Sequence, residues 1–133
     1  MILGIGHDIC DQRRIANILA RFDTRFINRI LTEQEQAEFA KRKQKEAYLA
    51  GRFAVKEAVY KALSGADQSN MRWHHAMTLN NAKGAPHLTL SDACLAGAEA
   101  LLPAGYDLRV FVSISDEPPY SAAFVVISAE PLK

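Results

Sequence analysis

Hydrophobic and polar positions alternate along residues 1–9, MILGIGHDI. Successive side chains of a strand point to opposite faces. One face of the predicted strand therefore carries mainly large apolar residues, whereas the other carries Gly4, Gly6 and Asp8. Glycines inside a strand indicate that another segment approaches the backbone closely. The opening residues thus predict a strand that packs tightly against a neighbour and ends near a carboxylate.

Helical periodicity follows this strand. Apolar residues recur at the i, i+3, i+4 and i+7 spacing of an amphipathic helix, at Ile15, Ile18, Leu19 and Phe22. We expect the same helix to carry Arg14, Arg21 and Arg25, which then lie within about 40° of one another at the edge of the apolar stripe.

A second helical region begins at Thr32, because Thr32 and Glu35 have the spacing of a capping box. The helical pattern continues, with a break near residues 43–45, as far as Gly65. Glycine is the residue type favoured just beyond a helix C-terminus. The sequence therefore predicts a long helix in the middle of the chain.

The second half of the chain is rich in strand signals. Residues 66–75 have the composition of a loop, and residues 77–90 predict a hairpin with its turn around 81–86. A short helix is expected at 93–102, before the strand pair DLRVFVSIS and YSAAFVVIS. This order predicts one α+β domain over residues 1–133, with a mainly antiparallel sheet packed with a long helix.

The segment AGRFAVKEAVYKAL, residues 50–63, has charges in unusual places. Glu57 and Lys61 lie about 40° apart on a helix, and Arg52 and Lys56 form a second such pair on another side. The remaining surface is apolar almost all round, whereas an ordinary surface helix has one apolar stripe and one solvated face. Charges set into apolar surface suggest a functional role.

Composition limits the class of protein. The chain has 133 residues, of which 49% are hydrophobic and 23% charged, as in a globular domain. No apolar run approaches the roughly 18 residues of a membrane span. The start lacks the features of a signal peptide, and Cys10 and Cys94 have no CxxC spacing. We expect a cytoplasmic protein with reduced thiols and no zinc site.

Charge is distributed unevenly along the chain. Residues 1–65 contain 12 Lys and Arg against 8 Asp and Glu, a balance of +4, whereas the remainder has 4 against 7, a balance of −3. The basic half indicates an anionic partner or substrate. The excess is too small, and too poor in interleaved aromatic residues, to indicate nucleic acid.

Asp8 and Glu57 are the candidate metal ligands. Two neighbouring carboxylates would favour Mg²⁺, which takes one or two carboxylates and completes its shell with water and phosphate oxygens. Lys61 would then lie beside a phosphate, and Arg52 and Lys56 could hold further phosphates. From spacing alone, the simpler interpretation is favoured, in which Glu57 and Lys61 form an ordinary i, i+4 ion pair.

Two interpretations also remain open for Arg14, Arg21 and Arg25. Three arginines on one helix face are usually a solvated face. Their position beside an apolar stripe also fits a docking surface for an acidic helix. Dinucleotide-binding, P-loop and serine-hydrolase motifs are missing from the sequence.

Several segments resemble the signatures of one family, in order and over nearly the whole chain. These are GIGHDICDQRRI, RFINRILTEQE, LAGRFAVKEAVYKAL, NAKGAPHLTLS and VFVSISDEPPYSAAFVVI. They resemble the holo-acyl carrier protein synthases, which are small 4′-phosphopantetheinyl transferases. The resemblance implies transfer of 4′-phosphopantetheine from coenzyme A to a serine of apo-acyl carrier protein, with release of adenosine 3′,5′-bisphosphate.

The resemblance also implies roles for individual residues. Asp8 and Glu57 would hold Mg²⁺, and Glu57 and Lys61 would be catalytic. The coenzyme A-binding residues would be Arg52, Lys56, Lys61, Ser64 and Gly65. Arg14, Arg21 and Arg25 would bind the acidic carrier protein, and the small members of the family are homotrimers with active sites between subunits.

Two positions depart from the family pattern. Asp116 stands where the family usually has a histidine near a coenzyme A phosphate, and Ala85 replaces a lysine in the hairpin. Two other classes of protein therefore remain alternatives. One is a non-catalytic nucleotide- or carrier-binding module without the metal site, and the other is a trimeric structural protein whose helix charges only pair across subunits.

Overall fold

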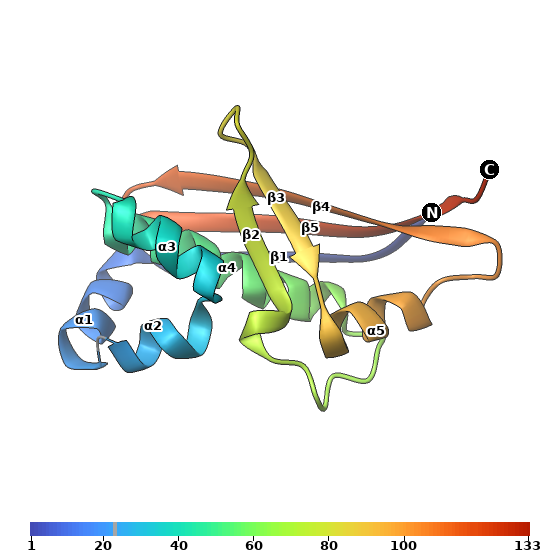
Figure 1. Ribbon diagram of the computed structural model, residues 1–133, viewed down its shortest axis with the longest axis horizontal. Helices are drawn as coiled ribbons and strands as arrows, with labels where there is room; N and C mark the ends of the chain where they lie inside the picture. Colours follow the sequence, from blue (N-terminus) through green and yellow to red (C-terminus); the bar gives the residue numbers. More distant parts are fainter. Residues whose placement is uncertain (23) are drawn as a thin grey trace.

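The computed structural model of the chain describes residues 1–22 and 24–133. Figure 1 shows its elements, in the order β1 (Ile2–Asp11), α1 (Gln12–Phe22), α2 (Thr24–Ile30), α3 (Glu33–Lys41), α4 (Lys45–Ala62), the 3₁₀ turn η1 (Trp73–His75), β2 (Ala76–Asn80), β3 (Pro86–Leu90), α5 (Asp92–Ala100), β4 (Tyr106–Glu117) and β5 (Tyr120–Pro131). The expected fold class, a mainly antiparallel sheet packed with a long helix, is confirmed.

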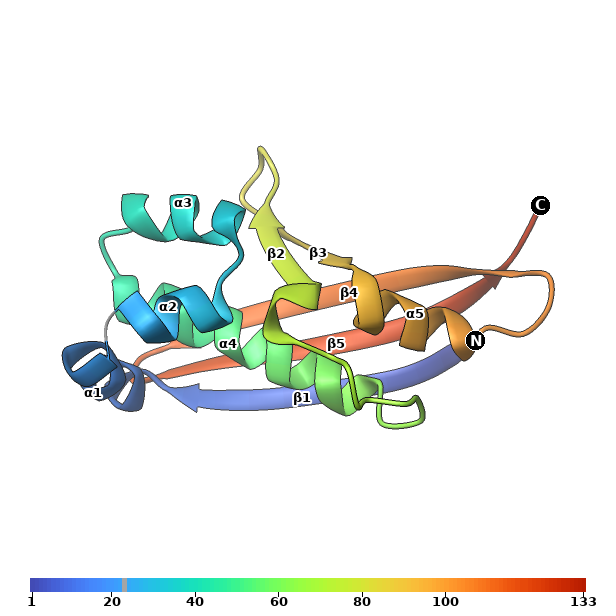
Figure 2. The same ribbon diagram turned by 60° about the horizontal axis from the view of Figure 1, so that its bottom comes forward.

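The sheet has the strand order β1-β5-β4, and both neighbouring pairs are antiparallel. Helix α4 lies along one face of this sheet, and the separate β2–β3 hairpin stands beside the helix. Figures 1 and 2 place α1, α2 and α3 at the end of the sheet opposite to both chain termini. None of the helices in the described parts of the chain combines the length and apolarity of a bilayer-spanning segment.

Small residues bring α4 directly onto β1. A Cβ added to Gly4 would overlap the carbonyl oxygen of Ala62, and one added to Gly6 would overlap the carbonyl oxygen of Ala58. Ala58 and Ala62 belong to a buried alanine stripe that recurs every four residues along one face of α4. The strand glycines therefore mark a close helix–strand contact, as the sequence predicts.

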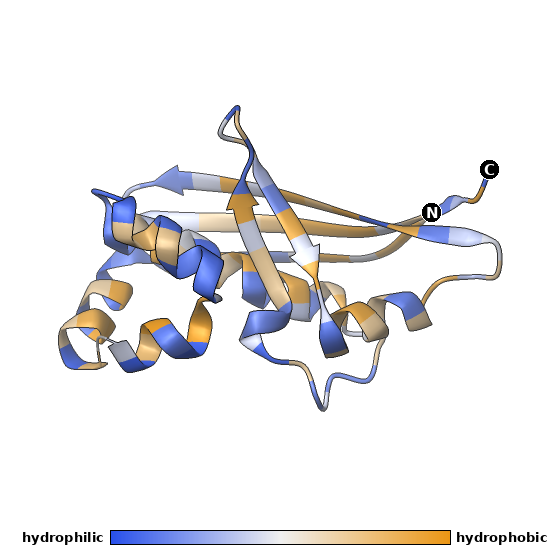
Figure 3. Cartoon of the chain, in the orientation of Figure 1, coloured by the Kyte–Doolittle hydropathy of each residue, from blue (hydrophilic) through white to orange (hydrophobic). Residues whose placement is uncertain are grey.

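The two faces of the sheet differ in what covers them. The helix-facing side carries buried residues such as Val125 and Ile127, which are 0% exposed. The opposite side carries large apolar residues that are exposed within one chain, namely Ile5, Ile9, Phe111 and Phe124. Hydrophobic colour runs along β4 and β5, whereas α1, α2 and α3 alternate between hydrophobic and hydrophilic positions (Figure 3).

The helix boundaries confirm one signal and correct two others. The capping box forms: the Thr32 hydroxyl accepts from the Glu35 N–H at 3.2 Å, and Glu35 Oε1 accepts from the Thr32 N–H at 2.9 Å. The expectation of one helix carrying all three arginines is wrong, because α1 ends at Phe22 and Arg25 belongs to α2. The long helix ends at Ala62, so Gly65 lies in the turn beyond it rather than at C′.

A buried ion pair joins three elements. Glu35, from α3, and Lys56, from α4, have side chains that are 0% and 1% exposed and lie 2.8 Å apart. The Lys56 ammonium also donates to the carbonyl oxygens of Trp73 and Ala76, and Glu35 Oε2 accepts from the Thr78 N–H at 2.9 Å. The pair therefore fixes the β2–β3 hairpin against α3 and α4.

Candidate active site

The close packing of α4 on β1 brings Asp8 to the charged end of the helix. The Lys61 ammonium donates to the Asp8 carboxylate at 3.1 Å and to the carbonyl oxygen of His7 at 3.0 Å. The Asp8 side chain is 18% exposed and that of Lys61 is 54% exposed, so the pair lies at the edge of solvent. In the described residues Lys61 therefore pairs across elements with Asp8, and the simpler interpretation of a Glu57–Lys61 pair is not what the structure contains.

Glu57 lies close enough to Asp8 for the two charges to interact. Partial burial raises the pKa of the Glu57 carboxyl, and the negative charge of Asp8 raises it further. The cations Lys61 and Arg14 oppose this shift. Two carboxylates that repel each other at the surface form a site of high negative potential, which an added cation would stabilise.

The chemistry of this carboxylate pair fits Mg²⁺. Its donors are oxygen atoms from two carboxylates, which is the usual protein contribution to a magnesium site. The described residues contain no group of three or more His, Cys, Asp or Glu side chains that could hold a metal ion. Asp8 and Glu57 are the two residues that could hold Mg²⁺, and water and phosphate oxygens would complete its shell.

Arg52 lies on another side of α4 from this pair. It is 6% exposed, it donates to the Asn80 side chain at 3.0 Å, and its guanidinium carbon lies 4.4 Å from the centre of the Tyr48 ring. Its Nε is buried and lacks a hydrogen-bond partner within the described residues. A buried N–H without an acceptor raises the free energy of the folded state. An anionic group bound on this side of the helix would supply the missing acceptor.

Arg52 lines a polar cavity of about 410 Å³ at the hairpin side of α4. Arg42 and Lys43 add two more cations to this cavity. Sequence reasoning missed both, although Lys43 lies in the predicted helix break, and loop residues often bind ligands. Asp116 also lines the cavity, and its carboxylate accepts from the Ser121 hydroxyl at 2.7 Å.

The remaining candidates for coenzyme A lie in different surroundings. Ser64 and Gly65 are exposed in the turn that follows α4, near the end of the helix that carries Lys61. Lys56 is buried, and all of its hydrogen-bond donors are engaged by Glu35 and by two backbone carbonyl groups. Within one chain, the structure therefore groups Lys61 with Asp8 and Glu57, and it places Arg52 and Lys56 elsewhere.

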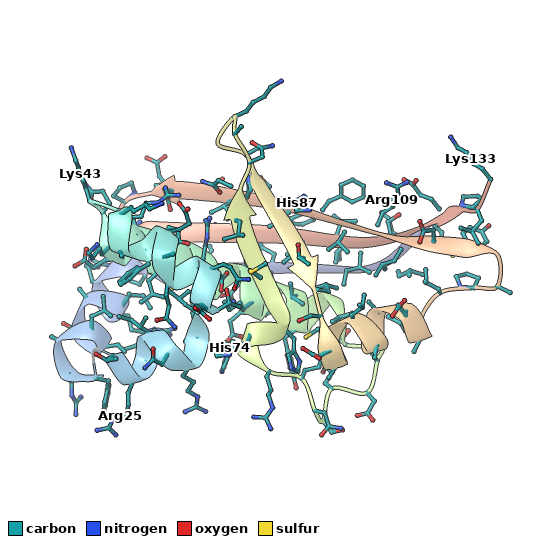
Figure 4. All side chains as sticks on the ribbon, viewed as in Figure 1. Arg25, Lys43, His74, His87, Arg109 and Lys133 are labelled. Atoms are coloured by element: carbon teal, nitrogen blue, oxygen red, sulfur yellow. The ribbon has the colours of Figure 1, made fainter. Side chains whose placement is uncertain are left out.

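The three arginines predicted for a carrier protein are all exposed. Arg14 and Arg21 lie on α1, and Arg14 also stacks on Phe53 of α4, with its guanidinium carbon 5.8 Å from the ring centre. Arg25 projects from α2 on the side away from the sheet (Figure 4). The arginines are thus carried on two helices at one end of the molecule, and Arg14 lies near enough to Glu57 to act on its pKa.

Comparisons with known proteins identify the family of the chain. Residues 4–117 match the family model described as the 4′-phosphopantetheinyl transferase superfamily. The chain is 40% identical over 132 residues to a holo-[acyl-carrier-protein] synthase of Methylorubrum populi, covering 99% of this chain and 97% of that protein. The resemblance to these synthases and the expected class of enzyme are thereby confirmed.

Solved structures give the same result. The crystal structure of holo-[acyl-carrier-protein] synthase from Neisseria meningitidis has a TM-score of 0.83 and 35% identity, covering 96% of this chain and 99% of that chain. The Helicobacter pylori synthase in complex with coenzyme A has a TM-score of 0.76 and 29% identity, covering 93% and 99%. By sequence and fold, this chain belongs to the 4′-phosphopantetheinyl transferase superfamily.

Proposed function

We propose that the chain is a holo-[acyl-carrier-protein] synthase that transfers 4′-phosphopantetheine from coenzyme A to a serine of apo-acyl carrier protein. The observation that carries the proposal is the meeting of Asp8, Glu57 and Lys61 where α4 crosses β1. The serine oxygen forms a bond to the phosphorus that bears pantetheine, and the pyrophosphate bond breaks. Adenosine 3′,5′-bisphosphate leaves.

Phosphoryl-type transfer depends mainly on positioning and on charge neutralisation. Asp8 and Glu57 would hold Mg²⁺, which supplies a Lewis acid for the pyrophosphate oxygens. Lys61 neutralises charge on the phosphate, because its exposed ammonium can turn from Asp8 towards a bound anion. Glu57, or a water beside it, is the candidate base for the serine proton.

The cationic cavity is the proposed site for the outer phosphate of coenzyme A, with Arg52 as its central residue. Ser64 and Gly65 would lie near the nucleotide. Lys56 is left out of this group, since the pairing with Glu35 already uses its ammonium. Arg14, Arg21 and Arg25 would bind the acidic carrier, which delivers its serine to the carboxylate pair.

We also propose a homotrimer with active sites between subunits. Ile5, Ile9, Phe111 and Phe124 expose between 43% and 59% of their surface on the sheet face away from α4. An apolar patch of this kind favours burial against another protein surface. An interface would also allow the cationic cavity of one subunit to meet the carboxylate pair of the next.

The two free cysteines support the proposed cytoplasmic location.

The direct test mixes the protein with coenzyme A, Mg²⁺ and an apo-acyl carrier protein, and follows the mass of the carrier. A mass gain equal to the phosphopantetheine arm supports the transferase. Binding of the carrier without a mass gain supports the non-catalytic module. Full activity of the Asp8→Ala and Glu57→Ala variants would exclude the proposed metal site and favour a structural role for the helix charges.

A further inference from the structure

Two cations of the cationic cavity lie against one aromatic ring. The guanidinium carbon of Arg52 is 4.4 Å from the centre of the Tyr48 ring, and that of Arg42 is 4.9 Å from the same centre. Both distances are within the roughly 6 Å reach of a cation–π contact. All three residues line the cavity of about 410 Å³. One ring therefore holds two like charges close together at the wall of this cavity.

Few other groups fix the two guanidinium groups. Arg52 donates to the Asn80 side chain at 3.0 Å, and its buried Nε lacks a partner within the described residues. The Arg42 guanidinium lies 3.8 Å from the Glu38 carboxylate, and both of these side chains are more than a third exposed. A surface pair of this length contributes little. The Tyr48 ring is thus the contact that the two arginines share.

The ring itself is fixed by the fold. Tyr48 is 6% exposed, and its hydroxyl donates to the carbonyl oxygen of Glu35 at 3.2 Å. The Phe39 ring packs beside it, with the two ring centres 6.0 Å apart. Burial raises the pKa of the Tyr48 phenol, so the hydroxyl stays protonated at neutral pH and keeps this hydrogen bond. Helices α3 and α4 together therefore hold the ring against the two guanidinium groups.

We propose that Tyr48 is a positioning residue, which acts through Arg42 and Arg52 on the outer phosphate of coenzyme A. The negative face of its ring attracts both guanidinium groups and offsets their mutual repulsion before any anion binds. Both groups can then donate to one phosphate, because guanidinium N–H groups match phosphate oxygens in pairs. The inference rests on the proposed function and adds the residue that arranges the phosphate-binding arginines.

The other charges of the cavity are arranged differently. Lys43 is exposed, and its side chain extends away from the body of the molecule (Figure 4). Asp116 also lines the cavity, and its carboxylate accepts from the Ser121 hydroxyl. Ordering a free ammonium on a ligand costs rotamer entropy, whereas groups that are already held lose less on binding. We therefore expect phosphate affinity to depend more on the two arginines at the ring than on Lys43.

Calorimetry with two ligands separates positioning from a general structural role. Coenzyme A carries the outer phosphate, whereas 3′-dephospho-coenzyme A lacks it and is otherwise identical. Each ligand is titrated into protein with Mg²⁺ and no carrier. We expect Tyr48→Leu to weaken coenzyme A binding about tenfold and to leave binding of the dephospho ligand within about twofold of wild type. Equal weakening of both ligands, or unchanged binding of coenzyme A, would overturn the inference.

Two variants serve as matched controls. Tyr48→Phe keeps the ring and loses only the hydroxyl, so its coenzyme A affinity should stay within about twofold of wild type. Phe39→Leu removes a neighbouring ring that is 9% exposed and lies outside the described lining of this cavity, and its binding should match wild type. A loss of coenzyme A affinity in Phe39→Leu as large as that in Tyr48→Leu would show that the ring acts only by packing, and would reject the inference.

A ring with the opposite charge distribution tests the same contact at nearly constant volume. Replacing Tyr48 with pentafluorophenylalanine keeps an aromatic ring, but the fluorine atoms make its face positive, so the ring repels the guanidinium groups. Coenzyme A affinity should fall about tenfold relative to Tyr48→Phe. This comparison decides the question if Tyr48→Leu does not fold. An affinity equal to that of Tyr48→Phe would refute a positioning role for the ring.

The proposed function and this inference fail in different ways. Binding of coenzyme A without any mass gain on a carrier would reject the transferase and leave the comparison of Tyr48 variants readable. Equal affinity of wild-type protein for coenzyme A and its dephospho form would show that the cavity does not bind the outer phosphate. The inference would then be rejected, while transfer of the arm to a carrier would still support the proposed function.

Discussion

Replacing Lys56 with methionine should reduce the free energy of unfolding by about 3–5 kcal/mol, the cost of removing one partner from a buried ion pair. The substitution keeps most of the side-chain volume, so the loss comes from charge and hydrogen bonding. The Glu35 carboxylate, which is 0% exposed, loses the ammonium at 2.8 Å and keeps only backbone N–H donors. Two carbonyl oxygens, of Trp73 and Ala76, lose their donor as well.

A double variant isolates the electrostatic part of this loss. In Glu35→Gln/Lys56→Met the buried charge is gone, and a glutamine oxygen can still accept from a backbone N–H. We expect the double variant to be more stable than Lys56→Met alone, by about 1–3 kcal/mol. Urea unfolding at one fixed protein concentration measures each value, because association shifts apparent stability.

Lys41→Met is the matched control, since the Lys41 side chain is 75% exposed and lies 4.0 Å from Glu38. Its expected effect is within about 0.5 kcal/mol. If Lys56→Met lost less than about 1 kcal/mol, or no more than Lys41→Met, the Glu35–Lys56 pair would not stabilise the fold in the way described.

Three further predictions follow from the site and its surroundings. Gly6→Ala should separate β1 from α4, because the new Cβ overlaps the carbonyl oxygen of Ala58, and transfer activity should fall more than tenfold in an assay with saturating substrates. Burial raises the pKa of the Cys94 thiol to about 11 from 9.0. The thiol of the unfolded chain therefore ionises first, and wild-type protein should lose roughly 2–3 kcal/mol of stability between pH 9 and 11. Cys94→Ala should lack that loss in parallel urea titrations. Charge reversal at Arg14 and Arg21 should raise KM for the carrier and flatten its salt dependence while kcat changes little, and an unchanged KM would remove these arginines from the docking surface.

The sequence predicts the elements of this fold well because their signals are local. Alternation in residues 1–9, the capping box at Thr32 and the strong β runs near the C-terminus each depend on neighbours a few residues away. The structure contains these elements, with bounds that differ by a few residues. Arg25, which the periodicity argument assigns to the first helix, lies on α2.

The site is less predictable because helix geometry gives angles and not partners. The spacing of Glu57 and Lys61 is compatible with an ion pair between them, and only the packing of β1 on α4 shows that Lys61 contacts Asp8. The half-buried charges of α4 do indicate special roles, but the roles differ from residue to residue. Lys56 is buried because it forms an ion pair with Glu35. Glu35 lies 21 residues away in the sequence, so spacing alone cannot identify it as the partner.

The separation of the carboxylate pair and the cationic cavity on different sides of α4 has a consequence for mixed assemblies. A chain with Asp8→Ala would keep an intact Arg52, and a chain with Arg52→Met would keep an intact Asp8. If each active site takes one half from each of two adjacent subunits, co-refolding these two inactive proteins should recreate complete sites in roughly a quarter of the interfaces. Two defective polypeptides should therefore complement each other, because Arg52 lies on a different side of α4 from the carboxylate pair.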